Sequence, residues 1–393
     1  MATTRHHHWR SPADERYTPP AATETSGERA LQRLIEPAGL TLNGNEPWDP
    51  VIRDQRACAE ILRRGSLGAG EAYMRGWWDA RDLSDFFYRL LRAGLPAGFG
   101  RWQVLRLVLR EWLTNPQRAG KAFEVGEAHY DRGNELFRAM LDKRMVYSCG
   151  YWEDVDDLDA AQGRKLDLIC RKLGLRAGQR VLDIGCGWGS FCRFAAERYG
   201  VSTVGVTVSR EQVELGRELC DGLPVELRLQ DYRELDESFD HIVSVGMIEH
   251  VGVKNYGTLF DVARRCLKPG GLFLLHTIGR PRTTPSADAW VSRYIFPNGH
   301  LPSLRQLTAA CEGRFVVEDV HNFGADYDRT LMAWFANFDA AWPALRERYD
   351  ETFYRMWKYY LLSCAGAFRA RDVQLWQLVL SPRGVEGGYR RPR

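Results

Sequence analysis

The feature that most constrains the fold of this chain is a glycine-rich turn within residues 180–190, Arg-Val-Leu-Asp-Ile-Gly-Cys-Gly-Trp-Gly-Ser. An apolar run leads into Asp183 and then into glycines at alternate positions, Gly185, Gly187 and Gly189. Glycines have no Cβ atom, so a ligand can lie against the backbone, and a helix that begins near Trp188 would offer unpaired N–H groups. The segment therefore predicts a strand, a tight turn and a helix that bind a nucleoside.

Two nucleoside cofactors compete for such a turn. The dinucleotide fingerprint is Gly-x-Gly-x-x-Gly, with the pyrophosphate on the helix N-terminus and an acidic ribose ligand about twenty residues later. This chain instead reads Asp-x-Gly-x-Gly-x-Gly over residues 183–189. A carboxylate before the first glycine repels a pyrophosphate and attracts the cationic amino-acid end of S-adenosylmethionine. The order favours S-adenosylmethionine over NAD, and an ordinary strand-to-helix turn stays open as the alternative.

Composition excludes several classes of protein. The chain has 393 residues, of which 45% are hydrophobic, so it is long enough for two domains with sizeable cores. Its net charge of +3 implies no field on the scale that binds nucleic acid. Nine cysteines are an odd number, and neither a secretory segment nor a run of eighteen apolar residues is present. We expect reduced thiols, a cytoplasmic protein and no membrane span.

The N-terminal third divides into a tail and a helical region. Residues 1–27 are rich in Thr, Pro, Ala and charge, which predicts a disordered tail. The cluster His6, His7 and His8 in this tail has no Cys or carboxylate partner at ligand spacing, so a solvated tail or a cloning remnant is favoured over a metal site. Residues 28–120 show helical patterns with glycine breaks, which predicts a small, mainly helical N-terminal domain.

One helical segment in that domain is both basic and amphipathic. Residues 99–113 place tryptophans and leucines on one stripe and arginines elsewhere. Between Arg92 and Lys121 the chain has six basic residues and one acidic residue. Such a helix is attracted to an anionic membrane surface, by about 1 kcal/mol per basic residue. The alternative is a helix that packs its stripe into its own domain.

Residues 121–393 predict the catalytic domain. Short apolar runs at 180–184, 203–206, 225–229, 241–245 and 272–276 alternate with helical stretches. This alternation specifies an α/β fold with a doubly wound parallel sheet, whose ligands bind at the carboxyl ends of the strands. Runs at 315–320 and 373–380 add two strands, the last of them antiparallel. Seven such strands fit a class I methyltransferase sheet better than a dehydrogenase.

Polar residues follow the second and third strands of this sheet. Thr207 stands where an acidic ribose ligand is usual, so the ribose hydroxyls must find other acceptors, and Thr207 with Gln212 can supply them. Gln230 and Asp231 can lie against the adenine edge. Polar residues that merely cap a strand end are the alternative. The residues predicted to contact the cofactor are Tyr147, Ser148, Asp183, Gly185, Cys186, Gly187, Gly189, Thr207, Gln212, Gln230, Asp231 and Tyr232.

Several motifs together resemble the bacterial cyclopropane-fatty-acyl-phospholipid synthase family. They occupy residues 65–78, 147–152, 181–189, 243–252, 276–279, 294–299 and 322–331, so the resemblance runs from about Leu31 to the end of the chain. One departure is Ile248, where the family usually has Phe, and this change removes no polar group. The pair Tyr147 and Ser148 enters the list of cofactor contacts through this resemblance.

The resemblance implies a reaction and its partners. The family transfers a methylene from S-adenosylmethionine to a cis double bond of a phospholipid acyl chain. Methyl transfer leaves a carbocation, and a proton must then leave the new methyl group before the ring closes. In the family a bound bicarbonate takes that proton. The residues that match its ligands are Cys149, Glu249, His276, Ile278 and Tyr327. The resemblance also implies a homodimer.

The ligand chemistry of bicarbonate is reasonable for four of these residues and puzzling for one. His276 and Tyr327 can donate hydrogen bonds, Ile278 can offer its backbone N–H, and Cys149 adds a weak S–H donor. Glu249 would repel an anion unless bicarbonate keeps its proton and donates it to Glu249, which we favour, or unless Glu249 acts through His276. Each residue also has a structural alternative, of which a buried apolar cysteine is the commonest.

Two other functions stay open. A related lipid C-methyltransferase would give a methyl-branched acyl chain, and a noncatalytic lipid-binding protein would keep the fold alone. An enzyme that acts on acyl chains of a bilayer must dock on anionic lipid, so we interpret residues 99–113 as a membrane-docking helix. The protein is then expected to associate peripherally with the inner face of the membrane.

Overall fold

The computed structural model describes residues 25–94, 133–284 and 288–392. The predicted docking helix at 99–113, the boundary near residue 120 and the cluster His6 to His8 lie outside the described residues. Helix α1 (Ser26–Ile35) begins inside the segment predicted as a tail, residues 1–27. The reason is a capping box, in which the Thr25 hydroxyl accepts a hydrogen bond from the N–H of Glu28 and the Glu28 carboxylate accepts one from the N–H of Thr25.

Four helices and a small sheet form the N-terminal region. Helices α2 (Arg56–Arg64) and α3 (Ser66–Met74) are separated at Gly65, whose φ of 59° ends the first helix, and α4 (Leu83–Ala93) follows. Strands β1 (Val51–Ile52) and β2 (Trp78–Asp79) pair antiparallel between them. These two-residue strands are too short to show the alternation that reveals a strand in sequence, and they were not predicted.

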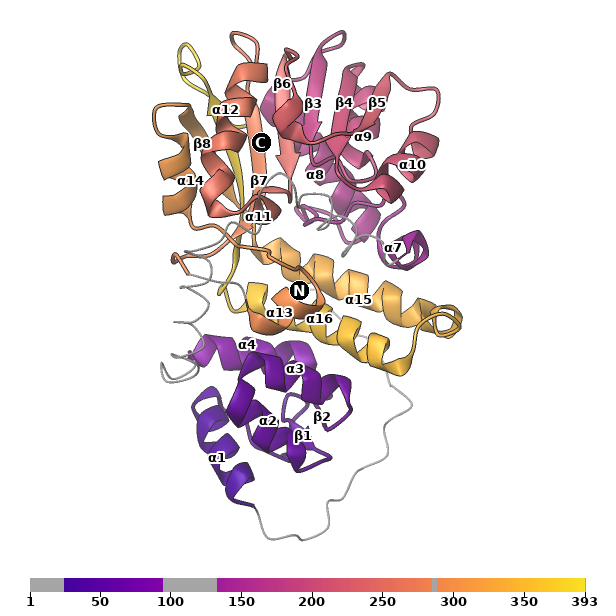
Figure 1. The fold of residues 1–393 in the computed structure, drawn as a ribbon, viewed down its shortest axis with the longest axis vertical. Coiled ribbons are helices and arrows are strands. Elements are labelled where there is room, and N and C mark those ends of the chain that lie inside the picture. Colours follow the sequence, from indigo (N-terminus) through magenta and orange to yellow (C-terminus); the bar gives the residue numbers. More distant parts are fainter. Residues whose placement is uncertain (1–24, 95–132, 285–287, 393) are drawn as a thin grey trace, which may run out of the picture.

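A seven-stranded sheet forms the upper part of the molecule in Figure 1. Its strands are β3 (Arg180–Ile184), β4 (Ser202–Thr207), β5 (Val225–Leu229), β6 (His241–Val245), β7 (Phe273–Gly279), β8 (Val316–Asn322) and β9 (Gln374–Ser381). The order is β5-β4-β3-β6-β7-β9-β8, with β3 to β7 parallel and β9 antiparallel to both of its neighbours. The predicted doubly wound sheet with an antiparallel last strand is confirmed.

Helices cover both faces of this sheet because its central strands are apolar on both sides. Alternate residues of β7 show the pattern. Leu274 packs with α8 (Leu158–Leu173) and α9 (Ser190–Tyr199), whereas Phe273 and Leu275 pack with α12 (Tyr256–Cys266) and α14 (Leu304–Cys311). Helices α10 (Arg210–Leu219) and α11 (Ile248–Val251) follow β4 and β6. The carboxyl ends of the parallel strands therefore stay open as the ligand edge.

The turn after β3 is longer than predicted. Helix α9 begins at Ser190, not near Trp188. The reason is that Gly185, Gly187 and Gly189 all have positive φ angles of 83°, 55° and 76°, so helical backbone cannot start before the last of them.

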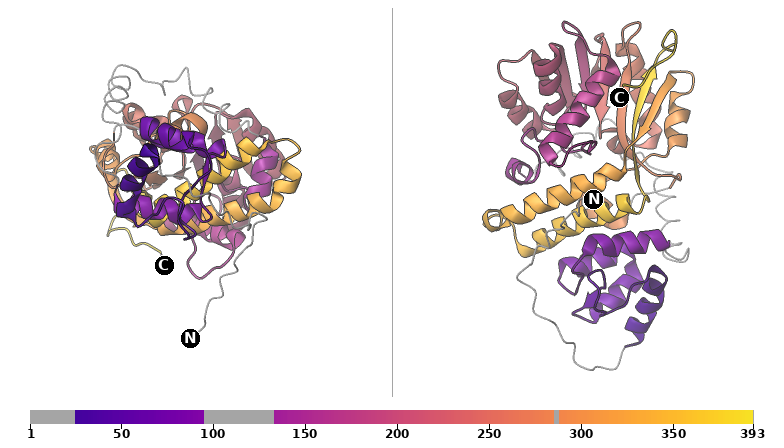
Figure 2. Two further views of the ribbon diagram at one scale, coloured as in Figure 1. Left: turned by 90° about the horizontal axis from the view of Figure 1, so that it is seen from below. Right: turned by 180° about the vertical axis from the view of Figure 1, so that it is seen from behind.

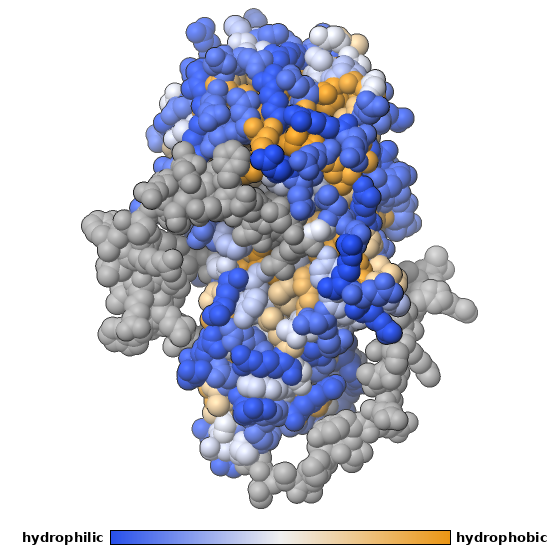
Figure 3. Space-filling model, turned by 45° about the vertical axis from the view of Figure 1, so that its right-hand side comes forward, coloured by the Kyte–Doolittle hydropathy of each residue, from blue (hydrophilic) through white to orange (hydrophobic). Residues whose placement is uncertain are grey.

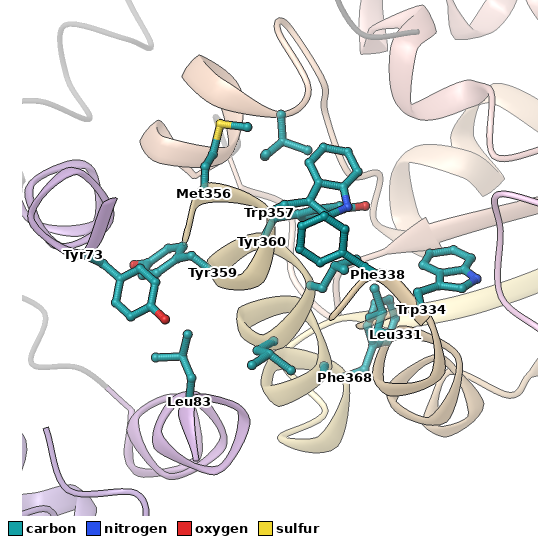
Figure 4. Packing of buried hydrophobic residues seen from close by; sticks show 14 of the residues in the cluster. Tyr73, Leu83, Leu331, Trp334, Phe338, Met356, Trp357, Tyr359, Tyr360 and Phe368 are labelled. Atoms are coloured by element: carbon teal, nitrogen blue, oxygen red, sulfur yellow. The ribbon is translucent and has the colours of Figure 1, made fainter. Parts of the chain in front are cut away.

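Two long helices lie between the sheet and the N-terminal region (Figure 1 and Figure 2). They are α15 (Ala325–Leu345) and α16 (Glu351–Arg369), and the shorter helices α7 (Asn134–Met140) and α13 (Ala289–Tyr294) flank them. In Figure 4 Tyr73 of α3 and Leu83 of α4 lie beside Tyr359 of α16, and the two tyrosine ring centroids are 5.3 Å apart. The Arg355 guanidinium of α16 donates to the Tyr73 and Trp78 carbonyls. The N-terminal helices thus share one core with α15 and α16.

Within the described residues, no helix combines the length and the apolar composition that crossing a bilayer requires.

Candidate active site

The glycine turn forms one wall of a cavity of about 200 Å³, here called the cofactor pocket. The three glycines serve it differently. A Cβ atom on Gly187 would meet nothing within 4 Å, so this glycine faces open space and gives a ligand access to the backbone. A Cβ atom on Gly185 would lie 2.6 Å from the Met247 side chain, and one on Gly189 would lie 2.9 Å from the Leu227 side chain. The predicted role in ligand approach therefore fits Gly187, whereas the other two also allow close packing of the protein itself.

Asp183, the residue before the last of β3, lines the cofactor pocket. Its carboxylate is 2% exposed, and burial raises its pKa to about 7. One oxygen, Oδ2, accepts a weak S–H bond from Cys192 at 3.7 Å, and Oδ1 has no partner in the described part of the chain. A buried acceptor of this kind is ready to receive the N–H groups of a cationic ligand.

A buried lysine beside Asp183 escaped sequence analysis. Lys165 of α8 is 1% exposed, lines the cofactor pocket and donates from Nζ to Ser148 Oγ at 2.7 Å. Burial lowers its pKa to about 8, against the opposing charges of Asp142 and other neighbouring groups. The available signal was the position of a lysine on the apolar stripe of a helix, among buried residues such as Leu166 and Ile169.

The polar residues after β4 and β5 meet in the cofactor pocket. Thr207 Oγ1 donates to Gln212 Oε1 at 2.9 Å, so this predicted pair does lie together. Gln230, Asp231 and Tyr232 line the same pocket. Asp231 also accepts from the backbone N–H of Arg233 at 3.0 Å and pairs with its guanidinium at 2.8 Å. Asp231 therefore acts as a capping residue, which was the alternative, and it also lines the pocket in which the ligand contact is predicted.

A second cavity of about 410 Å³, here called the apolar pocket, adjoins the first. Its wall is mostly aliphatic and aromatic, with contributions from α1 to α4, α13, α15 and α16. Figure 3 shows apolar side chains at the surface in the middle of one face, above the largely polar N-terminal region. The residues that line both pockets are Tyr147, Ser148, Gly246 and His250. The two cavities therefore meet at the carboxyl ends of the strands.

Glu249 is placed in the apolar pocket by the short helix α11. It is 7% exposed, and burial raises its pKa to about 7. Oε1 accepts the backbone N–H of Ile278 at 2.7 Å, whereas Oε2 is buried without a partner among the described residues. The Ile278 N–H, which is predicted to donate to an anion, donates to Glu249 in this structure.

His276 of β7 presents an unused ring nitrogen to the apolar pocket. It is 1% exposed, and burial keeps its pKa well below the usual range, so the ring is neutral. In the orientation that the structure shows, Gln377 Nε2 lies 3.2 Å from His276 Nδ1 and donates to it. The ring proton then resides on Nε2, which has no partner in the described ranges. His276 can thus donate one hydrogen bond to a bound oxygen.

Tyr327 lines the apolar pocket together with Glu249 and His276, whereas Cys149 does not. The Tyr327 ring lies 4.5 Å from that of Phe368. Cys149 is fully buried and lines neither pocket. Its Sγ donates a hydrogen bond to the Gly150 carbonyl at 3.1 Å. Burial raises its pKa, so it is a thiol. The predicted S–H donor is engaged with the backbone, and the alternative of a buried cysteine describes it.

His250 is a further residue that sequence analysis missed as a site residue. It lies at the junction of both pockets, partly buried, with Nδ1 lacking a partner within the part of the chain described. Burial lowers its pKa to about 4, so it is neutral. Its position directly after Glu249 was the available signal, but the sequence could not show which of two neighbours faces the junction.

No group of three or more His, Cys, Asp and Glu side chains in the described ranges has the arrangement of a metal site.

Comparison with known proteins identifies relatives of this chain. A family model described as mycolic acid cyclopropane synthetase matches residues 117–378. The chain is 53% identical over 366 residues to cyclopropane-fatty-acyl-phospholipid synthase of Escherichia coli K12, covering 92% of this chain and 95% of the relative. It is 32% identical to the tuberculostearic acid methyltransferase UfaA1 of Mycobacterium tuberculosis, over 88% of this chain and 87% of the relative.

Solved structures agree with the sequence comparison. The mycolic acid cyclopropane synthase CmaA1, complexed with SAH and CTAB, is 33% identical with a TM-score of 0.61, and the match covers 66% of this chain and 97% of that one. Coclaurine N-methyltransferase, at 22% identity and a TM-score of 0.60, shares the fold. The class I methyltransferase fold predicted for this chain is confirmed.

Proposed function

Because this chain belongs to the mycolic acid cyclopropane synthetase family of S-adenosylmethionine-dependent lipid-modifying enzymes, we propose that it forms cyclopropane rings on unsaturated phospholipids. A methylene from S-adenosylmethionine is added to the cis double bond of an acyl chain. The observation that carries this proposal is the junction of the two pockets, where the cofactor pocket, which holds the buried Asp183 and Lys165, meets the apolar pocket beside Glu249 and His276.

The cofactor pocket fits S-adenosylmethionine. Gly187 leaves the backbone accessible, and Asp183 Oδ1 is a buried acceptor that has no donor within the described residues. Thr207 and Gln212 would bind the ribose hydroxyls, and Gln230 and Asp231 the adenine edge, since all four residues line this pocket. When bound, this cosubstrate supplies an electrophilic methyl group. The protein must then bring the acyl double bond to near contact distance at the junction, because an alkene is a poor nucleophile.

The apolar pocket suits the carbocation that methyl transfer leaves on the acyl chain. Its wall keeps water from the cation, and the rings of Tyr147, Tyr327 and Tyr360 lie on that wall. Aromatic faces stabilise a cation by roughly 0.5–2 kcal/mol each. Tyr147 is held by its phenol oxygen, which lies 2.9 Å from that of Tyr360. These rings therefore exclude water and favour positive charge at the same place.

A proton must then leave the new methyl group, and bicarbonate fits the groups that surround it. His276 Nε2–H and the Tyr327 hydroxyl would donate to bicarbonate, and Glu249 Oε2 would accept its proton. Bound there, bicarbonate would supply a general base. The raised pKa of Glu249, about 7, leaves its carboxylate able to hold a shared proton at this site. These three side chains carry the proposal, since the Ile278 N–H and the Cys149 thiol are engaged elsewhere.

The reaction is tested by incubating the protein with S-adenosylmethionine and monounsaturated phospholipid vesicles, followed by mass and olefin analysis of the acyl chains. We expect a gain of one CH2 with loss of the olefinic signal. A gain with a branched methyl group would identify a lipid C-methyltransferase instead. No gain, with lipid still bound, would identify a noncatalytic lipid-binding protein.

Peripheral membrane association is a second part of the proposal. Residues 25–94 have ten arginines and ten carboxylates, so they supply no net attraction to anionic lipid. The basic excess lies between Arg92 and Lys121, which includes the predicted docking helix. We expect the change of Arg101, Arg106 and Arg110 to Glu to abolish sedimentation with anionic vesicles at the inner-membrane charge density. Unchanged sedimentation would contradict the docking role.

A homodimer is also proposed. Light scattering tests it by measuring the molar mass of the protein in solution.

A further inference from the structure

The wall of the apolar pocket includes one arginine that the proposed reaction does not use. Arg280 directly follows β7, and its backbone N–H donates to the Pro302 carbonyl at 2.8 Å. The side chain is half-buried, and its guanidinium has no ion-pair or hydrogen-bond partner among residues 25–94, 133–284 and 288–392. A guanidinium has five N–H donors and stays charged, so one left unpaired beside an apolar cavity calls for an anionic ligand.

A buried histidine on the same wall gives an independent observation. His300 is 8% exposed, and its Nε2 has no partner within the described chain. Its backbone N–H donates to the Glu249 carbonyl at 2.8 Å, which fixes the residue beside the catalytic group. The backbone bond from Arg280 to the Pro302 carbonyl, two residues after His300, brings the two residues together on the wall of this pocket. A cation and an unused imidazole nitrogen therefore share one part of the pocket.

The carboxylate nearest in sequence does not neutralise this place. Asp288 also lines the apolar pocket, but its Oδ1 accepts the backbone N–H groups of Trp290 and Val291 at 2.9 and 3.0 Å. That carboxylate is therefore engaged as the N-cap of α13. Among the described residues, Asp288 forms no ion pair with Arg280.

The position of Arg280 relative to the reacting groups decides what it can touch. Alternate residues of a strand share a face, so Arg280 lies on the face of His276 and Ile278. At about 3.3 Å per residue, its Cα atom is roughly 13 Å from that of His276. A substrate group at Arg280 is thus separated from the double bond at the junction by a length of acyl chain.

We propose that Arg280, with His300, binds the phosphodiester group of the substrate phospholipid. The acyl chain then runs from Arg280 past Glu249 toward the walls supplied by the N-terminal helices. A guanidinium matches two phosphate oxygens with parallel N–H groups, which gives both affinity and orientation. This inference rests on the proposed function, since it assigns the polar end of the same substrate.

The test compares two lipids in the same detergent micelles, a monounsaturated phospholipid and the diacylglycerol with the same acyl chains. The quantity measured is the ratio of kcat/KM for the phospholipid to kcat/KM for the diacylglycerol. We expect Arg280→Gln to lower this ratio about 10- to 100-fold, and Arg280→Lys to restore part of it. Arg282→Gln is the matched control, because Arg282 is exposed two residues later and lines neither pocket.

The outcomes separate this inference from the proposed function. A wild-type protein that alkylates neither lipid refutes the proposed function. A wild-type protein that alkylates the phospholipid, with an unchanged ratio in Arg280→Gln, refutes only the phosphodiester site. If free phosphate is the ligand, inorganic phosphate alters wild-type turnover of diacylglycerol, and Arg280→Gln loses that response without a change in the ratio. That result would also overturn the lipid assignment.

Discussion

The cofactor pocket and the apolar pocket share a wall, yet they are assembled in different ways. The cofactor pocket takes its lining from residues 145–251, mostly strand ends and the turns that follow them. The apolar pocket takes its lining from residues 31 to 375, on helices far apart in the sequence. The first depends on local strand-turn-helix geometry and the second on how α16 packs against α3 and α4. We therefore expect that mutations can change cofactor affinity and lipid-substrate specificity independently of each other.

The largest effect should come from breaking the chemistry on the apolar side alone. Glu249→Gln keeps an acceptor oxygen for the Ile278 N–H but removes the ionisable group. We expect kcat to fall about 10²- to 10⁴-fold, while the affinity for S-adenosylhomocysteine stays within about twofold. Calorimetric titration beside a turnover assay measures both. A large loss of cofactor affinity would show that the two pockets are not separable at Glu249.

The protonation of Glu249 gives a pH-dependent test of the same residue. Burial raises its folded pKa to about 7, above the 4.5 of an exposed glutamate, so the folded protein binds this proton more tightly than the unfolded chain. Its contribution to the free energy of unfolding is therefore fully present below pH 4.5 and is lost as the pH rises through 7.

Glu249→Gln removes that dependence. We expect the free energy of unfolding of the variant, relative to wild type, to rise by about 3 kcal/mol between pH 4.5 and pH 8. Denaturant titrations at several pH values measure it. A difference that is flat with pH would mean that Glu249 titrates as an ordinary carboxyl group.

The corresponding test of the cofactor pocket changes Asp183 and measures cofactor affinity. Asp183→Asn removes the negative charge from a buried acceptor that faces the cofactor pocket. We expect the affinity for S-adenosylhomocysteine to fall about 10- to 100-fold, with a smaller change in kcat at saturating cofactor. Unchanged affinity would show that Asp183 does not bind the cofactor. A fall in kcat alone would show that Asp183 acts in the chemical step instead of in cofactor binding.

A smaller effect should follow from disturbing the wall of the apolar pocket without touching its polar groups. A Cβ atom on Gly70 of α3 would lie 2.2 Å from the Trp290 ring, and Trp290 lines that pocket. Gly70→Ala should therefore lower the free energy of unfolding by about 1–2 kcal/mol and reduce turnover of long acyl chains. Cofactor affinity should not change. Ala at Gly163, which would meet nothing within 4 Å, is the control.

The part of the structure that sequence predicted well is the part built locally. The central strands of the large sheet are short apolar runs between turn residues, and the order Asp183, Gly185, Gly187 follows from the needs of one turn. Thr207 ends β4 and Gln212 lies in the first turn of the helix that follows, α10, so their meeting is also local. Periodicity and spacing carry such information directly.

What sequence did not predict depends on contacts between distant segments. Ile278 has its N–H occupied because α11 brings Glu249 against β7, and Cys149 faces a backbone carbonyl, not the pocket. Lys165 lies on the apolar stripe of α8, and the packed structure shows that this stripe borders the cofactor pocket. Arg280 follows a strand like many surface arginines, and the missing partner is visible only in three dimensions. Each of these facts is a property of packing, which no residue pattern encodes alone.

The shared wall of the apolar pocket has a consequence for the integrity of the protein. Residues of α1, α2 and α4 face residues of α16 and of the strand ends across the same cavity. An acyl chain in that cavity would touch both sides, and a ligand that binds only the folded state stabilises it by mass action. The lipid would then act as a removable part of the core, so the thermal resistance of the enzyme should rise and fall with the unsaturated lipid around it.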